Sequence, residues 1–285
     1  MNTENLKTFI ALSKYKNFTR TAEALFVAQS TVTNRIAELE KKVGQRLFER
    51  ERKNMYLTEE GIRFLDYANR IIELEQAAVN NINVSEKYPN KINIGATNTI
   101  YDCHLKDRLK SYIQINNNTA LKVTIAHSVP LIEMLNDGVI DVAFTYAEYA
   151  KKGIECIPFH NDEMVLVTNS RNKEFIDGIK LNDLASINYL YCNFTFQGIG
   201  EYIRDLFPKY HRFSFEIDRS ANIIPYLEGS GGYSFLPKSL IASELQSGIL
   251  AEIPLLDFEM PQIKSFAIYN ADSKNCRNGF LEFVV

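Results

Sequence analysis

The sequence predicts an α/β protein made of a small helical N-terminal domain, one long helix and a larger C-terminal domain of alternating strands and helices. Three observations predict this. Two short helical segments with a tight break between them lie within residues 17–58 and are followed by a basic segment. A helical pattern then runs without a break from 59 to about 84. From residue 92 onward, short apolar runs alternate with helical patterns, which is typical of α/β domains.

Charge separates the N-terminal segment from the rest of the 285-residue chain. The net charge is -3, but residues 1–58 hold 11 Lys and Arg against 6 Asp and Glu, so they carry +5 and the remainder carries -8. This distribution is expected if only the N-terminal domain approaches phosphate. Apolar runs are too short to span a membrane, and polar residues interrupt any signal-peptide core, so we expect a cytoplasmic protein with no membrane partner.

The first 44 residues predict three helices. Residues 4–15 place apolar side chains on one face and form a supporting helix. Thr19 is expected to cap a second helix over 20–25, and Ser30 a third that runs to about residue 42. Gly44 then ends the third helix as a left-handed C-terminal residue.

The third helix has one apolar and one polar face. Helical spacing puts four side chains on the apolar face: Val32, Ile36, Leu39 and Val43. The polar face near its start is predicted to meet DNA bases through Gln29, Ser30, Thr31, Thr33, Asn34 and Arg35. An isolated helix of this kind would more simply be a solvated face, but the neighbouring basic segment favours the DNA interpretation.

That basic segment predicts a wing. It contains Arg46, Arg50, Arg52 and Lys53. Residues 55–57 then form a strand-like run that ends at Thr58, so a basic hairpin would lie beside the third helix. Arg50, Arg52 and Lys53 are predicted to contact phosphates.

At this point the sequence resembles the LysR-type transcriptional regulators. The matched positions are Phe18, Ala22, Gln29, Ser30, Val32, Ile36, Leu39, Glu40, Gly44, Leu47, Phe48, Arg50, Leu57, Thr58 and Gly61. The departures are Thr21, Thr31 and Lys53, none of which removes a phosphate-binding charge. The resemblance implies a bacterial regulator that binds double-stranded DNA, and contacts RNA polymerase if it is an activator.

Residues 59–84 predict a linker helix capped by Thr58, with an apolar stripe too wide for one domain contact. Leu65, Ile72 and Val79 are seven residues apart, which favours a coiled-coil-like antiparallel pairing and therefore a homodimer or homotetramer. The alternative is that this helix lies across the chain's own second domain. Residues 85–91 are polar, contain the first proline, and predict a hinge.

Residues 92–285 predict a two-lobed effector-binding domain with a mostly parallel sheet in each lobe. Lobe I takes about 92–162 and 263–285, and lobe II about 163–262. Strands are expected at 92–96, 121–126, 139–145, 164–168, 187–192, 213–217 and 263–269, and helices at 102–115, 130–136, 199–207, 223–228 and from 279. Two further segments match the family: Leu135, Gly138, Asp141 and Ala143, and the glycine-containing turn in 227–237, where Ser230 replaces a usual glycine.

The resemblance implies a type II periplasmic-binding-protein fold, in which a small molecule binds between the lobes. Parallel sheets also place ligands at the carboxyl ends of their strands. The expected effector-binding residues are Thr97, Asn98, Thr99, Ser128, Thr145, Phe196 and Gln197. Tyr146 lies at the same strand end as Thr145. Any one of these could be a plain helix cap. Helix N-termini favour an anion such as a carboxylate, and only Arg219 could reach in to clamp it.

Two other classes of function are less well supported. An enzyme should show its chemistry at His104, His127, His160 and His211, but these lie in unrelated contexts without nucleophile or metal-ligand spacing, so no catalytic residue, metal or cofactor is expected. Four widely separated cysteines favour reduced structural thiols over a redox sensor. A purely architectural DNA-binding protein would leave the α/β domain unexplained.

Overall fold

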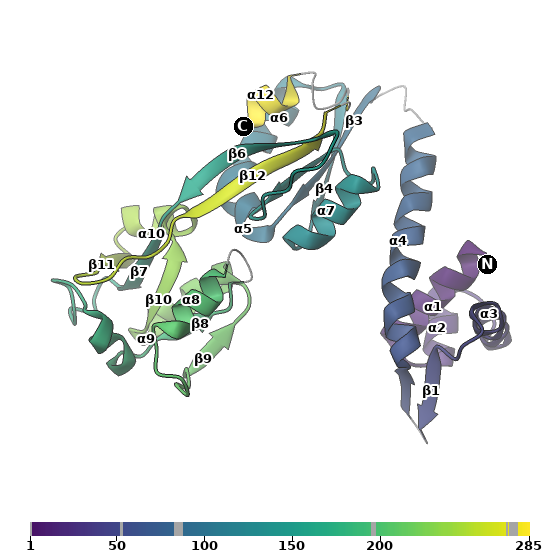
Figure 1. Cartoon of the computed structure of the whole chain (residues 1–285), viewed down its shortest axis with the longest axis horizontal. Helices are drawn as coiled ribbons and strands as arrows, with labels where there is room; N and C mark the ends of the chain where they lie inside the picture. The colour runs from purple at the N-terminus through teal and green to yellow at the C-terminus, as the bar shows by residue number, and fades with distance from the viewer. Residues whose placement is uncertain (1, 52–53, 83–87, 195–197, 272, 274–278) are drawn as a thin grey trace. The chain divides into compact units, whose positions relative to one another are not determined.

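The computed structural model describes residues 2–51, 54–82, 88–194, 198–271, 273 and 279–285 (Figure 1). The chain divides into two compact units, Met1–Val84 and Ser85–Val285. Each is described by itself. Across the described residues, no helix combines the length and apolar character needed to cross a membrane.

The first unit is a three-helix core with a two-stranded wing and a long fourth helix. Its elements are α1 (Thr3–Tyr15), α2 (Phe18–Leu25), α3 (Gln29–Val43), β1 (Phe48–Glu51), β2 (Asn54–Leu57) and α4 (Glu59–Ile82). α1 contacts α2, α3 and α4. The buried core is built from Leu6, Phe9, Leu12, Ala22, Val32, Ile36, Leu39, Leu47, Phe48, Met55 and Ala68. The predicted apolar face of the third helix is confirmed for Val32, Ile36 and Leu39.

The two predicted capping residues are wrong. α2 is capped by Asn17, whose side chain accepts a hydrogen bond from the Arg20 N–H, so the helix begins one residue before Thr19. α3 begins at Gln29 after Ala28, with no side-chain cap, and Ser30 lies inside its first turn. The tight break between the helices is a left-handed residue, Phe26, with φ 54°. Gly44 ends α3 in the left-handed region, as predicted.

The wing is fixed to the helices through side chain to backbone hydrogen bonds. The Glu40 carboxylate near the end of α3 accepts from the N–H groups of Leu47 and Phe48, at 2.8 and 3.2 Å. Thr58 caps α4 as predicted, because its hydroxyl accepts from the Gly61 N–H and donates to the Arg46 carbonyl. A Cβ atom on Gly61 would lie 2.2 Å from the Leu47 carbonyl oxygen, so only glycine fits this junction.

α4 turns only part of the predicted apolar stripe to solvent. Leu65 and Ile72 pack against the core of their own unit, together with Phe64 and the buried Ala68. The side chains left exposed on the adjacent face are Tyr67, Ile71, Leu74 and Ala78. Their spacing of four, three and four residues is that of a coiled-coil seam. Val79, the third residue of the predicted stripe, is also exposed, whereas Leu65 and Ile72 do not belong to the exposed apolar surface.

Lobe I of the second unit is a five-stranded sheet covered by helices. Its elements are β3 (Asn90–Ala96), α5 (Asn98–Ile100), the π-helix η1 (Tyr101–Leu105), α6 (Lys106–Ile115), β4 (Thr119–Ile125), α7 (Ser128–Asn136), β5 (Val142–Thr145), β6 (Ile154–Asp162), β12 (Ile263–Asn270) and α12 (Phe280–Val284). The strand order is β4-β3-β5-β12-β6. β3 pairs in parallel with β4 and β5, whereas β12 is antiparallel to β5 and β6.

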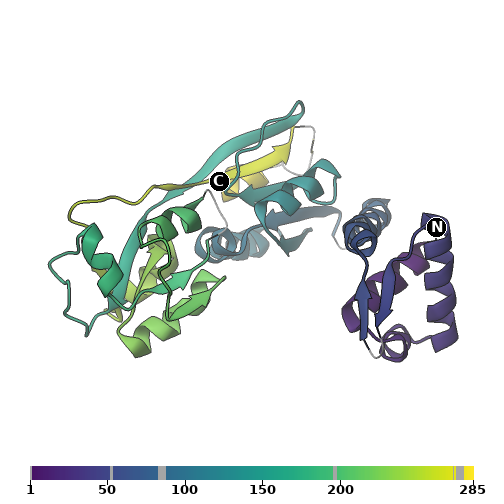
Figure 2. The ribbon, with the colours of Figure 1, turned by 60° about the horizontal axis from the view of Figure 1, so that its bottom comes forward.

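Lobe II follows directly after β6. Its elements are β7 (Met164–Asn169), η2 (Leu181–Ser186), β8 (Leu190–Cys192), α8 (Ile199–Asp205), β9 (Phe215–Ile217), η3 (Ser220–Ile223), α9 (Ile224–Ser230), β10 (Tyr233–Pro237), η4 (Lys238–Ile241), α10 (Ala242–Gln246) and β11 (Leu250–Ile253). β10-β7-β11 is antiparallel, and β8-β9 is a parallel pair. Figures 1 and 2 show β6 and β12 side by side where the chain leaves lobe I and returns to it.

The prediction of mostly parallel sheets is therefore wrong for lobe II and for two strands of lobe I. β6 was not predicted, and it contains Pro158, which an edge strand tolerates because its outer N–H groups need no partner. β3 starts at Asn90, inside the predicted hinge, whereas 85–87 lie outside the described residues. β5 starts only at Val142, and the Asp141 carboxylate just before it accepts from the Asn93 N–H at 2.7 Å.

Candidate nucleic-acid interface and ligand cavity

The start of α3 presents a compact polar surface. Gln29, Ser30, Thr33 and Asn34 are exposed, whereas Thr31 is half-buried. Ser30, Thr33 and Asn34 follow helical spacing and so lie on one face of the helix. Val32, Ile36 and Leu39 hold the opposite face in the core. Side chains of this type, on a helix fixed from behind, can exchange hydrogen bonds with base edges in a major groove.

Arg35 lies at a different place from the one expected. One of its Nη atoms donates to the Thr8 hydroxyl at 3.2 Å, and the other lies 3.3 Å from a Glu4 carboxylate oxygen. Both partners belong to α1. Arg35 therefore helps to attach α3 to the supporting helix, and in this structure it does not join the polar surface with Asn34.

The wing is formed as predicted, with Arg50 in β1 opposite Met55. The positions predicted to contact phosphates through Arg52 and Lys53 lie outside the described residues. The hairpin pairs Phe48 with Leu57 at its base, next to the Glu40 carboxylate. The basic segment is thus held at the end of α3, which is the placement a phosphate-binding wing needs.

The second unit contains a cavity of about 490 Å³ between lobe I and lobe II. Four predicted residues line it, Thr97, Asn98, Thr99 and Ser128, and so does Tyr146. The other lining residues are Ile125, Ala126, His127, Val129, Asn193, Phe194, Asp218, Arg219 and Ser220. A cavity of this size, with an apolar wall and a few polar groups, suits a small molecule.

Of the predicted effector-binding residues that the structure describes, Thr145 is not among the lining residues. Thr145 is fully buried, and its hydroxyl donates to the Ala147 carbonyl at 2.7 Å, so it does not line the cavity. Phe196 and Gln197 lie outside the described residues. Sequence reasoning missed Asn193, Asp218 and Ser220. The signal was available for the last two, because they follow β9 directly and strand ends carry ligand-binding loops.

Polar groups from the two lobes meet at this cavity. Arg219 of lobe II has a guanidinium nitrogen 3.6 Å from an Asp102 carboxylate oxygen in η1 of lobe I. The same Asp102 oxygen accepts from the Asn98 amide at 3.0 Å. The Thr99 and Ser220 hydroxyl oxygens are 3.4 Å apart across the lobes. Arg219 is thus the cation that the sequence left in doubt, and it lines the cavity.

Two hydroxyl groups differ in how well their hydrogen bonds are satisfied. The Thr97 hydroxyl is buried and has no hydrogen-bond partner among the described residues. Burial raises the pKa of Tyr146, and a hydrogen bond with Thr99 opposes that shift, so the phenol stays neutral near pH 7. Among the described residues, the cavity therefore offers neutral hydroxyl groups together with the Arg219 cation and the Asp218 carboxylate.

Two of the cysteines that the structure describes, Cys103 and Cys192, are poorly suited to redox sensing. Burial, followed by the nearby carboxylates Asp162 and Asp102, raises the pKa of Cys103 to about 12. Burial and then Asp218 raise the pKa of Cys192 to about 12. Both thiols stay protonated near pH 7, and the thiolate is the reactive form. Cys276 lies outside the described residues.

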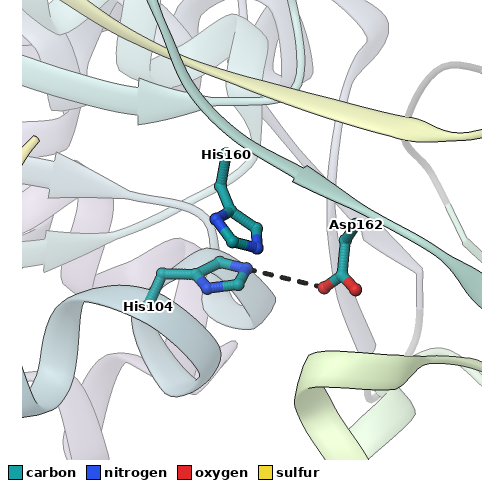
Figure 3. A group of neighbouring side chains, drawn as sticks. All are labelled: His104, His160 and Asp162. Carbon is teal, nitrogen blue, oxygen red and sulfur yellow. Dashed lines mark ion pairs between the residues drawn. The ribbon is translucent and has the colours of Figure 1, made fainter.

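Two of the four histidines, His104 and His160, lie together, contrary to the sequence prediction of unrelated contexts. His104 in η1 and His160 in β6 have ring centroids 3.9 Å apart, and the His104 Nε2 lies 3.5 Å from an Asp162 carboxylate oxygen (Figure 3). Although burial opposes it, hydrogen bonds from His104 and Ser239 hold the pKa of Asp162 below its usual value. Burial lowers the pKa of His160, and His104 lowers it further.

A helix-turn-helix unit with a wing, joined to a two-lobed ligand-binding unit, defines a DNA-binding regulator. Residues 3–62 match the bacterial regulatory helix-turn-helix proteins of the lysR family, and residues 86–284 match the LysR substrate binding domain. The chain therefore belongs to the LysR family of transcriptional regulators, with a DNA-binding domain and an effector-binding domain. The resemblance seen in the sequence is confirmed.

Similar proteins include other regulators of this kind. The chain is 29% identical over 286 residues to the HTH-type transcriptional regulator CitR of Bacillus subtilis (strain 168), covering 98% of this chain and 97% of that protein. It is 33% identical over 148 residues to the HTH-type transcriptional regulator HdfR of Escherichia coli O45:K1, and this match covers 51% of this chain and 53% of that protein. The solved structure of CbnR, a LysR family transcriptional regulator, has a TM-score of 0.72 at 20% identity and covers 100% of this chain and 98% of its own. The structure of full-length CbnR in complex with its target DNA has a TM-score of 0.69 at 20% identity, and the match covers 100% of this chain and 99% of that chain.

Proposed function

We propose that this regulator reads its operator with the exposed face of α3, as a homodimer or homotetramer in the cytoplasm, and responds to a small anionic effector in the cavity. It acts through binding and not through catalysis, and contacts RNA polymerase if it activates transcription. The observation that carries the effector proposal is Arg219 lining a cavity whose opposite wall is Thr97, Asn98 and Thr99.

The base-reading role is assigned to Gln29, Ser30, Thr33 and Asn34. They are the exposed polar side chains at the start of α3, and Asn and Gln can each make paired hydrogen bonds to adenine. Thr31 is assigned to the edge of this surface, and Arg35 to holding α3 against Glu4. Arg50, Arg52 and Lys53 of the wing are assigned to phosphates, in keeping with their charge and position in the chain.

The chemical class of the effector follows from the cavity's polar groups. The Arg219 guanidinium already lies beside the Asp102 carboxylate, so a second carboxylate can compete for the same cation. The unpartnered Thr97 hydroxyl would gain a hydrogen bond from such a ligand. Ile125, Val129 and Phe194 supply an apolar wall. A small carboxylate with an apolar portion fits this arrangement.

Effector binding would change how the lobes hold each other. Contacts across the cavity, Arg219 with Asp102 and Thr99 with Ser220, join lobe I to lobe II. A ligand that takes over one of these partners binds one lobe arrangement better than another. Only such differential affinity can shift a conformational equilibrium. The regulatory signal is therefore assigned to these two contacts.

Thr99→Val tests this function because it removes one hydroxyl and keeps the shape of the side chain. We expect operator affinity without effector to stay the same. Effector affinity should fall roughly two- to tenfold, for the loss of about 0.5–1.5 kcal/mol of hydrogen bonding. A screen of small carboxylates by thermal shift on the full chain supplies the ligand, and reporter transcription and operator affinity are then measured on the variant.

The matched control is Thr124→Val, which alters the residue before the cavity-lining Ile125 but not the cavity lining itself. It should respond as the unmodified protein does. A Thr99→Val protein with full effector affinity and a full response would remove this edge of the cavity from the proposed site.

A further inference from the structure

The cluster of His104, His160 and Asp162 lies outside the cavity lining and has no role in the function proposed above. His160 and Asp162 are two residues apart on β6, so both side chains leave the same face of the strand. His104 reaches them from the π-helix η1, as Figure 3 shows. One potential ligand atom from each of the three residues lies within 4.8 Å of the other two.

We propose that these three residues form a binding site for a divalent transition metal ion of the zinc class. Two imidazoles with one carboxylate are a donor set that suits zinc, nickel or cobalt, whereas magnesium and calcium prefer oxygen ligands alone. Three protein ligands leave further coordination positions for water or a small ligand.

The distances fit this type of ion. Ligand atoms about 2.1 Å from a tetrahedral zinc ion lie about 3.4 Å from each other. The His104 Nε2 and the Asp162 oxygen are already 3.5 Å apart. Because the full set lies within 4.8 Å, a ring rotation that moves the His160 ligand atom by up to about 1.4 Å would complete the site.

The surroundings keep the ligands in place. The side chains of His104 and Asp162 are each only 10% exposed. The second Asp162 oxygen accepts from the N–H groups of Glu163 and Ser239, at 2.9 and 3.3 Å, which orients the carboxylate toward His104. A metal ligand held by outer hydrogen bonds binds more tightly than a free one.

A histidine paired with a carboxylate is often only structural, and that simpler account covers two members of this cluster. It does not account for the position of His160, whose ring centroid lies 3.9 Å from that of His104. Two imidazoles in this position repel if both are protonated, whereas a shared metal ion uses the lone pair of each.

The proposed metal site lies where lobe I meets lobe II. Ser239 belongs to η4 of lobe II, so the carboxylate lies at the crossing between the lobes. The same π-helix turn that carries His104 also carries Asp102, the partner of Arg219 at the cavity. A metal ion would brace this turn against β6.

Titration calorimetry of the full chain with zinc chloride, after treatment with a chelator and its removal, tests the proposal. We expect a single saturable site in each chain, and an increase in melting temperature with zinc, since an ion that binds the folded state stabilises it. His160→Ala should weaken zinc binding roughly 100-fold or more, because loss of a ligand costs at least as much as loss of an outer partner. Asp162→Asn, which can still accept from Ser239, should also weaken it.

His211→Asn is the matched control, because His211 lies against Phe207 and Phe213, outside the cluster. It should keep the zinc affinity, and circular dichroism without metal checks that each variant folds. Cobalt supplies a second readout: we expect visible bands without a thiolate-to-cobalt charge-transfer band. The proposal is overturned by no saturable binding, by undiminished binding in His160→Ala, by equal weakening in His211→Asn, or by a thiolate band that places the ion on cysteine.

Discussion

Replacing Asn34 with alanine is expected to weaken operator binding by roughly 1–3 kcal/mol, which is about a 5- to 150-fold loss in affinity. The side chain is exposed on the face of α3 opposite Val32, Ile36 and Leu39, so its removal leaves the core intact. A paired hydrogen bond to one base is lost, and we therefore expect the preference at that base to relax. Binding to unrelated DNA and the salt dependence should stay unchanged, since both depend on phosphate contacts.

Operator affinity and base preference can be measured by fluorescence anisotropy on a set of operator variants. Asn117→Ala, an exposed asparagine in the second unit, is the matched control and should bind as the unmodified protein does. If Asn34→Ala weakened binding to every DNA equally, its role would be general contact with the backbone and not base reading.

Replacing Ile71 and Leu74 together with glutamate is expected to convert the protein to a monomer. Both side chains are exposed on the α4 face that also carries Tyr67 and Ala78, and burying the exposed part of each in a partner helix would contribute roughly 0.5–1 kcal/mol. Two carboxylates in the same seam repel across the dimer. Since a dimer contacts two half-sites, operator affinity should fall with it. Sedimentation velocity measures the change.

The control for this variant is Ile62→Glu, which alters an exposed isoleucine on another side of the same helix. It should sediment as the unmodified protein does. Ile72→Glu is unsuitable, because Ile72 packs against the core of the first unit and its loss would unfold that unit. A double variant that remains an oligomer would place the main interface on residues 85–285.

The helices of the first unit could be predicted because their signals are local. Apolar spacing placed Val32, Ile36 and Leu39 correctly, and Gly44 has the left-handed conformation that its residue type favours. The caps were harder, since Asn17, Thr19 and Ser30 can all cap a helix and only tertiary packing decides which does. Arg35 was misplaced because helical spacing does not reveal that Glu4 lies within reach.

The linker helix shows the limit of a heptad argument. Leu65 and Ile72 are seven residues apart, and so are Ile71 and Ala78. Spacing alone does not tell which of two apolar faces belongs to the chain's own core. The position of α1 decides this, because it covers the face that carries Ala68.

Part of the cavity lining could be predicted from the sequence. The rule that ligands gather at strand ends found Thr97, Asn98, Thr99 and Ser128. It also included Thr145, which does not line the cavity and whose hydroxyl is satisfied by the Ala147 carbonyl. No signal in the sequence predicted the cluster of His104, His160 and Asp162. His160 and Asp162 lie on β6, a strand that was not predicted, and β6 brings them next to His104, which comes more than fifty residues earlier in the chain.

A quantitative footprint of the operator, with and without a carboxylate effector, on the unmodified chain and on Arg219→Ala tests the effector account most directly. In the unmodified chain the effector should change the footprint or the operator affinity. In Arg219→Ala that change should be lost at the same ligand concentration, because removal of a hydrogen-bonded cation weakens effector binding by about 1.5–3 kcal/mol, or roughly 10- to 150-fold. Arg171→Ala, an exposed arginine of lobe II outside the cavity lining, should keep the full effect. An Arg219→Ala footprint that still changes at the unmodified chain's effector concentration would contradict the assignment of the cavity as the effector site.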